Sequence, residues 1–126
     1  MHHSRLCGFI IDCRTDDLQR EAKFWSEALG FGVHRSSDPD DANYLLLDAA
    51  SRDLEVELQQ VAHASRVHLD IEADDVEAEV HRLEKLGAKR LQQVRTWWVM
   101  EAPSGHRFCV VPARSAHFSA SANEWD

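Results

Sequence analysis

The stretch VHLDIEADDVEAEVHRLEKLGA, residues 67–88, contains the pattern that decides the fold. Apolar and polar residues alternate at its start, which is typical of a strand with one buried face. Further along, apolar residues are spaced four and then three apart, which is typical of an amphipathic helix. Asp74, followed by Glu77, is a candidate helix cap, and Gly87 is a candidate helix end. We therefore expect a strand and then a helix, at about 66–71 and 74–86.

The first half of the chain repeats this pattern at an offset of 58 residues. A strand at about 6–13 precedes an amphipathic helix at about 16–29, with Asp16 and Gly30 as its candidate cap and end. Short strand-like runs follow each helix: FGVHR, NYLLLD and LEVELQQV, then KRLQQV, TWWVM and HRFCVV. The coinciding pairs include Asp12 with Asp70, Asp17 with Asp75, and Ala22 with Val80.

This repeat predicts an α+β fold of two βαβββ modules that form a curved, mostly antiparallel sheet around a cleft. Module one covers about 5–61 and module two about 66–112, within a single domain of residues 1–112. Residues 113–126 show little periodicity and form a C-terminal tail. We expect a flexible start at His2 and His3 and assign them no role.

The composition limits the classes of partner that the chain can bind. The chain has 22 acidic and 14 basic side chains, a formal charge of −8, which argues against nucleic acid or an anionic membrane. No apolar run approaches the roughly 18 residues of a spanning helix. The three cysteines Cys7, Cys13 and Cys109 form no CxxC pair, which favours free thiols and a cytoplasmic location. We expect a small-molecule ligand, and a homodimer that covers exposed sheet edges.

Period-two alternation separates the two faces of the predicted strands. Glu57, His68 and Cys109 fall on the face away from the helices, and Asp70 and Arg107 share that face. Such a polar face is typical either of a sheet exposed to water or of a sheet that lines a wet cleft. In TWWVM the adjacent Trp97 and Trp98 must point to opposite faces, so one ring packs under a helix and the other lines the cleft or covers its mouth.

Three stretches resemble the vicinal oxygen chelate superfamily, which includes glyoxalase I, bleomycin and fosfomycin resistance proteins and extradiol dioxygenases. They are DDLQREAKFWSEALGF, VHLDIEADDVEAEVHRLEKLGA and EAPSGHRFCVV, and the resemblance covers about residues 5–112. IDCRTDD and RFCVV look like its glyoxalase-like branch. The resemblance implies paired βαβββ modules around a cleft, in which metal-dependent members bind a divalent ion through one residue from each of four strands.

Position by position, the resemblance implies Glu57 and His68 as two of these ligands. The histidine of the first strand falls on Ile10, or on Gly8 if RTDD contains an insertion, and neither can bind a metal. The acid of the last strand falls on Cys109. Glu57, His68 and Cys109 are therefore the candidate ligands if a metal is bound, because a thiolate suits zinc. Alternatively, Cys109 is a small buried side chain that only fills the strand.

The missing ligand favours a glyoxalase-like small-molecule-binding protein with a degenerate metal site and no cofactor, which sequesters or senses an oxygen-rich or aromatic compound. The alternative is a lyase or isomerase, or a dioxygenase-related enzyme, that uses one divalent ion (Zn, Fe or Mn) while Glu57 moves a proton. A third possibility is an assembly domain with a decayed cleft. The candidate ligand-binding residues are His68, Glu57, Arg107, Trp97 and Trp98.

Overall fold

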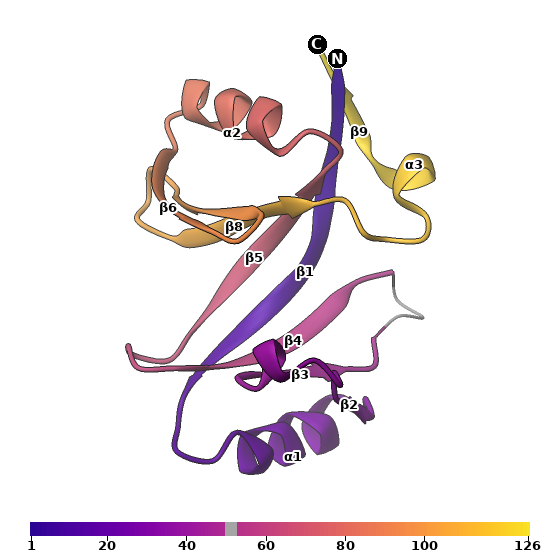
Figure 1. Cartoon of the computed structure of the whole chain (residues 1–126), viewed down its shortest axis with the longest axis vertical. Helices are drawn as coiled ribbons and strands as arrows, with labels where there is room; N and C mark the ends of the chain where they lie inside the picture. The colour runs from indigo at the N-terminus through magenta and orange to yellow at the C-terminus, as the bar shows by residue number, and fades with distance from the viewer. Residues whose placement is uncertain (50–52) are drawn as a thin grey trace. The chain divides into compact units, whose positions relative to one another are not determined.

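The computed structural model describes residues 1–49 and 53–126. The chain divides into two compact units, one of Gly8–Val67 and the other of Met1–Cys7 together with His68–Asp126. The elements follow the order β1 α1 β2 β3 β4 and then β5 α2 β6 β7 β8, which is βαβββ twice (Figure 1). The predicted α+β class and the repeated module are confirmed. The cleft expected from the resemblance stays a prediction.

The unit Gly8–Val67 contains the first helix and the strands that it covers. Its elements are β1 (His2–Arg14, shared with the other unit), α1 (Leu18–Leu29), β2 (Val33–His34), the short helix η1 (Pro39–Asp41), β3 (Tyr44–Leu47) and β4 (Glu55–Val61). Strand β4 pairs parallel with β1 and antiparallel with β3, which in turn pairs antiparallel with β2. The apolar side of α1 meets these strands in one core, formed by Cys13, Leu18, Ala22, Leu45, Leu47 and Leu58.

The cap of helix α1 lies one residue later than the sequence predicted. The side chain of Asp17, not Asp16, accepts a hydrogen bond from the amide of Arg20 and caps the helix. At the other end Gly30 adopts the left-handed conformation with φ 75°, and its amide donates to the carbonyl of Ser26. The predicted stop at Gly30 is confirmed, because a residue without Cβ takes this conformation at no steric cost.

The other unit contains the second helix and the C-terminal residues. Its elements are β5 (Arg66–Ala73), α2 (Val76–Lys85), β6 (Lys89–Val94), β7 (Trp97–Glu101), β8 (Arg107–Pro112), α3 (Phe118–Ser121) and β9 (Asn123–Trp125). Strand β8 pairs parallel with β5 and antiparallel with β7, and β7 pairs antiparallel with β6. The predicted mostly antiparallel pairing is confirmed.

The cap of α2 is also one residue beyond the predicted position. The side chain of Asp75 accepts from the amide of Ala78, whereas Asp74 accepts from the backbone amide and the ring of His3. These bonds, the backbone one above all, hold the pKa of the Asp74 carboxyl below its ordinary value. The repeat was therefore in the correct place, but the choice between two adjacent aspartates was wrong in both modules.

The two faces of the β5–β8 sheet have separate cores. On the α2 side lies a core of Ala73, Val80, Leu83, Met100 and Val110, against which Trp98 packs. On the opposite side Cys7, Cys109 and Val111 form a smaller cluster, against which Trp97 and Val99 pack. The adjacent tryptophans thus point to opposite faces, as a regular strand requires.

The N-terminal residues are not a flexible start. Strand β9 pairs antiparallel with residues 2–4 of β1, so the two chain ends lie side by side (Figure 1). His2 is 5% exposed, and its ring contacts the carboxylate of Glu79 on α2. The expectation for His2 and His3 was wrong because the carboxylates that bind them lie more than seventy residues away in sequence.

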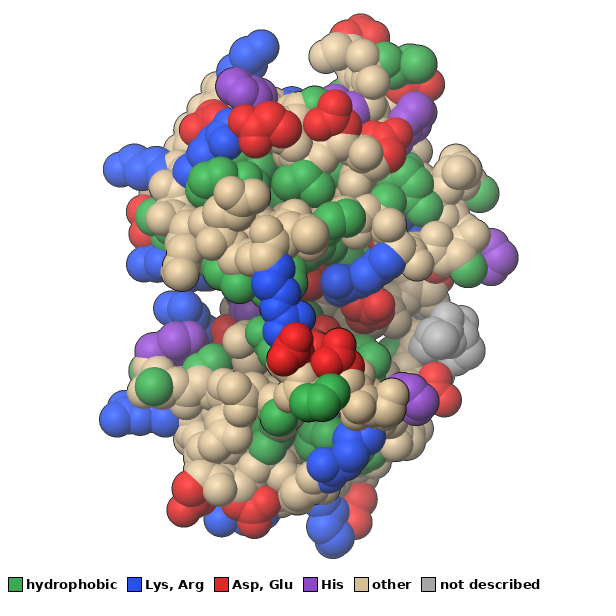
Figure 2. Space-filling view, viewed as in Figure 1, with side chains coloured by type: hydrophobic (Ala, Val, Ile, Leu, Met, Phe, Trp, Pro, Cys, Tyr) green, Lys and Arg blue, Asp and Glu red, His purple; other side chains and the backbone are tan. Residues whose placement is uncertain are grey.

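The surface carries side chains of both charges, as the composition indicates. Acidic and basic side chains are interspersed on the face shown in Figure 2. Among the described residues, no helix is long and apolar enough to cross a membrane.

Candidate metal centre

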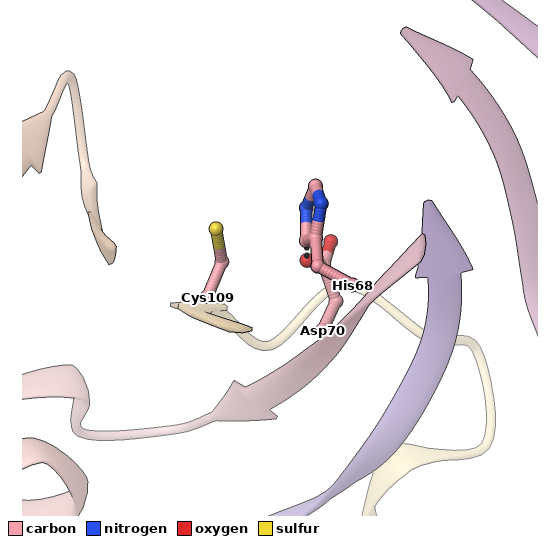
Figure 3. Close-up of side chains that lie close together, drawn as sticks. All are labelled: His68, Asp70 and Cys109. Carbon is pink, nitrogen blue, oxygen red and sulfur yellow. Dashed lines mark ion pairs between the residues drawn. The ribbon is translucent and has the colours of Figure 1, made fainter. Parts of the chain in front are cut away.

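Strands β5 and β8 bring three potential metal ligands together. His68 and Asp70 are two residues apart on β5 and therefore project from the same face. Cys109 is the register partner of Asp70 on the neighbouring β8. Figure 3 shows the imidazole, the carboxylate and the thiol on one side of these strands. Parallel pairing places the side chains of such partners on the same face, so the fold itself assembles the group.

The spacing of the three groups is close to that of a metal site. One donor atom from each of His68, Asp70 and Cys109 lies within 4.8 Å of the others. Nε2 of His68 lies 3.7 Å from Oδ1 of Asp70. Tetrahedral zinc with its usual bond lengths separates its ligand atoms by roughly 3.3 to 3.8 Å. The histidine and aspartate donors are close to this separation, and the cysteine sulfur lies within 4.8 Å of both.

The chemical types of the three donor atoms indicate which metal ion fits the site. An imidazole nitrogen, a thiolate and a carboxylate oxygen together suit zinc, whose catalytic sites have three protein ligands and an open fourth position. Magnesium and calcium prefer oxygen ligands, so a set that includes sulfur fits them poorly. All three side chains are well shielded from water, with Cys109 8% and the Asp70 side chain 7% exposed. The residues present therefore fit a zinc-type ion.

Charged side chains contact Asp70 and the neighbouring carboxylate of Glu72. Its Oδ2 lies 3.3 Å from a terminal guanidinium nitrogen of Arg114, which follows β8. Glu72, fully buried two residues further along β5, accepts hydrogen bonds from the amides of Arg114 and Ser115 at 2.8 and 3.0 Å. Nε of Arg5 lies 3.4 Å from the other oxygen of Glu72. A buried carboxylate is costly unless it is paired, and these contacts supply the pairing.

The cluster has an apolar wall as well. Cys7 on β1 directs its thiol to the backbone carbonyl of Asp70 at 3.5 Å, and it packs with Cys109 and Val111. The ring of Trp97 packs against this group. The polar donors therefore lie beside an aromatic side chain.

Among the residues singled out from the sequence, His68 and Cys109 lie together in this unit. Glu57 belongs to the other unit, where it is half-buried on β4 and opposite Leu46 on β3. Arg107 lies with Nε 3.6 Å from Oε2 of Glu101, its register partner on β7. The roles proposed for these residues stay predictions.

Sequence reasoning did not assign Asp70 or Arg114 to the site. Alternation had placed Asp70 on the correct face, and its spacing of two residues from His68 was the available signal. Asp70 was not assigned because the resemblance implies only one metal ligand from each strand. Arg114 lies in a segment without periodicity, so only the folded chain shows its neighbours.

Neither of the two first-strand positions to which the resemblance assigns a ligand can supply one. Ile10 is an apolar side chain with 4% exposure. At Gly8 no side chain fits, because a Cβ atom there would overlap the backbone carbonyl oxygen of Glu55 and lie 2.9 Å from the Cβ of that residue. Parallel pairing of Gly8 with Glu55 explains the close approach.

Comparison with known proteins gives the same fold. Residues 8–111 match the family described as Glyoxalase-like domain. The crystal structure of methylmalonyl-CoA epimerase from Mycobacterium tuberculosis is similar, with a TM-score of 0.65 and 16% identity over 86% of this chain and 88% of that chain. A hypothetical protein from Bacillus halodurans has a TM-score of 0.65 and 10% identity over 89% and 96% of the two chains.

A methylmalonyl-CoA epimerase variant from Streptomyces coelicolor, in complex with 2-nitronate-propionyl-CoA, has a TM-score of 0.56 and 16% identity over 86% and 98% of the two chains. At such identities the likeness shows the fold alone. Among curated proteins, none matches this sequence.

Proposed function

Because the chain belongs to the glyoxalase-like domain family of the vicinal oxygen chelate superfamily, we propose that it binds a small oxygen-rich molecule at a divalent metal ion held by His68, Asp70 and Cys109. In this proposal the protein is a metal-assisted lyase or isomerase. The observation that carries it is the mutual approach of the three donor atoms, within 4.8 Å, in a shielded part of one compact unit.

The proposal assigns a role to each side chain. His68 and Cys109 supply the nitrogen and the sulfur that favour zinc over harder cations. Asp70 supplies the third ligand with Oδ1, while its Oδ2 lies beside Arg114 and is thereby held in orientation. The proton-transfer role that the resemblance implies for Glu57 stays a prediction.

A zinc ion bound at this site would polarise a ligand oxygen as a Lewis acid, which makes a proton on the adjacent carbon easier to remove. Such chemistry requires a ligand with an oxygen atom next to the reacting carbon. A neighbouring epimerase structure contains methylmalonyl-CoA, which is a ligand of this general class. We propose the class for this chain, not that compound.

The second candidate is a metal-free binding protein, which is the function that the sequence favoured. It is favoured by the first strand, where Ile10 is apolar and Gly8 cannot carry a side chain. In this version the cleft sequesters or senses its ligand, and Cys109 only fills the strand. The two candidates differ in whether a metal is bound.

Metal analysis of protein purified without chelator or a nickel column distinguishes them. We expect about one equivalent of zinc per chain after reconstitution and dialysis, and loss of the ion in His68→Ala, Asp70→Ala and Cys109→Ser. Cys13→Ser and His106→Ala are matched controls. Cys13 is buried in the other unit, and His106 is exposed and bonded to Ser104 of its turn. Far less than one equivalent in the unaltered protein would favour the metal-free candidate.

A further inference from the structure

We propose that His3 holds the C-terminal strand β9 on the N-terminal end of β1 when its imidazole is protonated, and holds it more weakly when the ring is neutral. The ring lies between two carboxylates. Nδ1 is 2.8 Å from Oδ2 of Asp74, which precedes α2, and Nε2 is 3.5 Å from Oε1 of Glu124 on β9. All three residues belong to one compact unit, and none of them is a ligand of the proposed metal centre.

The number of protons on the His3 ring decides how many of these two contacts are attractive. A neutral imidazole has a proton on one nitrogen and a lone pair on the other, whichever tautomer forms. If Nδ1 carries the proton, it donates to Asp74, and the lone pair of Nε2 then faces the carboxylate of Glu124. A protonated ring donates from both nitrogens and attracts both carboxylates through its charge. The protonated form therefore joins β9 to the start of α2, and the neutral form does not.

Both carboxylates keep their charge over the pH range in which a histidine titrates. The backbone amide of His3 donates to Oδ1 of Asp74 at 2.7 Å, and this bond above all holds the pKa of the Asp74 carboxyl below its ordinary value of 3.8. The side chain of Glu124 is 61% exposed, and an exposed glutamate is ionised above about pH 5. Histidine changes its charge between about pH 5 and 8. Of these three groups, His3 is therefore the one that responds near neutral pH.

The other charged groups at this end of the unit also favour a proton on His3. Its neighbour His2 contacts Glu79 of α2, which in turn accepts from Arg82. The permanently ionised side chains of this region carry three negative charges and one positive charge, on Asp74, Glu79, Glu124 and Arg82 respectively. Protonation of His3 reduces this excess of negative charge, so the closed arrangement gains from it.

A modest change in attraction is sufficient to affect β9. The strand has only three residues, Asn123–Trp125, and it pairs with residues 2–4 of β1. Trp125 adds a hydrogen bond from its ring nitrogen to the Ser4 hydroxyl. A chain end that is held by few bonds opens at a low free-energy cost. Release of β9 would also uncover the backbone groups of residues 2–4 that now pair with it, and these could then pair with another chain.

Hydrogen exchange of the whole chain, measured by mass spectrometry at about pH 5.5 and about pH 8, tests this role of His3. The exchange rate of the peptide that contains β9 is divided by the intrinsic rate at each pH, and a peptide of α1 is the internal reference. The variants are His3→Gln and Glu124→Gln. The matched control is His81→Gln, because His81 is an exposed histidine that pairs with Glu77 along α2. Circular dichroism at both pH values checks that each variant is folded.

We expect the corrected exchange of β9 to be about threefold to fivefold faster at the higher pH, which is the effect of one partly exposed ion pair. An attachment that needs a protonated histidine is complete at low pH and is lost as pH rises. His3→Gln should remove this dependence because glutamine does not gain a proton in this range. Glu124→Gln should remove it because the ring then faces no charge on β9. The dependence should persist in His81→Gln, and the α1 peptide should show none.

Equal corrected rates at the two pH values in the unaltered protein, or slower exchange of β9 at the higher pH, would overturn the role of His3. A dependence that persists in His3→Gln or in Glu124→Gln would overturn it as well, and so would a dependence that His81→Gln removes. If His3→Gln does not fold, Glu124→Gln decides the question, since its side chain is largely exposed.

Discussion

The imidazole of His2 lies 2.8 Å from the buried carboxylate of Glu79, although 77 residues separate the two in sequence. Glu79 also accepts from the Ser4 hydroxyl at 2.7 Å and from Arg82 at 2.7 and 2.9 Å. Trp125 of β9 completes the cluster, because its ring nitrogen donates to Ser4 and its face lies 3.8 Å from the Arg82 guanidinium. Residues near both ends of the chain, His2 and Trp125, therefore contact side chains of α2.

Glu79→Ala should lower the free energy of unfolding by about 3 kcal/mol, because removal of one partner from a buried ionic cluster leaves its partners without their acceptor. Urea unfolding monitored by circular dichroism measures the change. Glu27→Ala is the control, since Glu27 is an exposed residue of α1 and pairs only at the surface with Lys23. Equal stabilities of the two variants would contradict the structural role of the cluster.

The same carboxylate predicts a dependence of stability on pH. Burial alone raises the pKa of Glu79, but the bonds from Arg82, His2 and Ser4 together outweigh it, so the pKa lies below its ordinary value of 4.5. A group with a lowered folded pKa stabilises the protein fully above the ordinary value and loses this contribution as pH falls through the folded pKa. The stability difference between the unaltered protein and Glu79→Gln should therefore shrink below about pH 4.5. A difference that grows on acidification would contradict the assignment.

Gly8→Ala should destabilise the protein by about 1 to 3 kcal/mol, the usual cost of overpacking. The added Cβ would overlap the Glu55 carbonyl oxygen, which is backbone and cannot move aside cheaply. Gly32→Ala is the matched control, because a Cβ at Gly32 meets nothing within 4 Å. Thermal unfolding of the two variants gives the comparison. A Gly8→Ala protein as stable as Gly32→Ala would reopen this position to a ligand side chain.

Trp97 and Trp98 should behave differently when each is changed to alanine. Trp98 packs on the core beneath α2, so its loss should cost about 3 kcal/mol of stability. Trp97 packs on the Cys109 side, so its loss should weaken zinc binding and remove the fluorescence change that we expect on addition of zinc. Identical losses of melting temperature and of ligand response in the two variants would sink this assignment.

The sequence predicted the module order, most strands and the face on which His68 and Cys109 lie, because periodicity and parity are local properties. It placed the helix caps at Asp16 and Asp74, but the adjacent Asp17 and Asp75 are the caps, since both members of each pair have the right chemistry and the backbone geometry chooses between them. Local signals therefore predict that a helix is present more accurately than they predict its first residue.

Contacts between distant segments were beyond sequence reasoning. The buried role of His2 depends on Glu79, and the position of Arg114 depends on Glu72, 42 residues earlier. Neither pair has a motif. Alternation along the strand placed Asp70 on the same face as His68, but the resemblance implies only one metal ligand from each strand.

The absorption spectrum of the cobalt-substituted protein tests the proposed metal centre most directly. Cobalt(II) takes zinc sites, and a bond to a thiolate gives an intense near-ultraviolet charge-transfer band. Cys13→Ser serves as the control cysteine variant, because Cys13 lies in the other unit. Burial, and then the nearby carboxylates of Glu21 and Asp12, raise the pKa of its thiol, which disfavours the thiolate form that binds a metal. We predict the band and tetrahedral visible absorption in the unaltered protein and in Cys13→Ser, and loss of the band in Cys109→Ser. Absence of the band from the unaltered protein, or its persistence in Cys109→Ser, would contradict a metal centre at His68, Asp70 and Cys109.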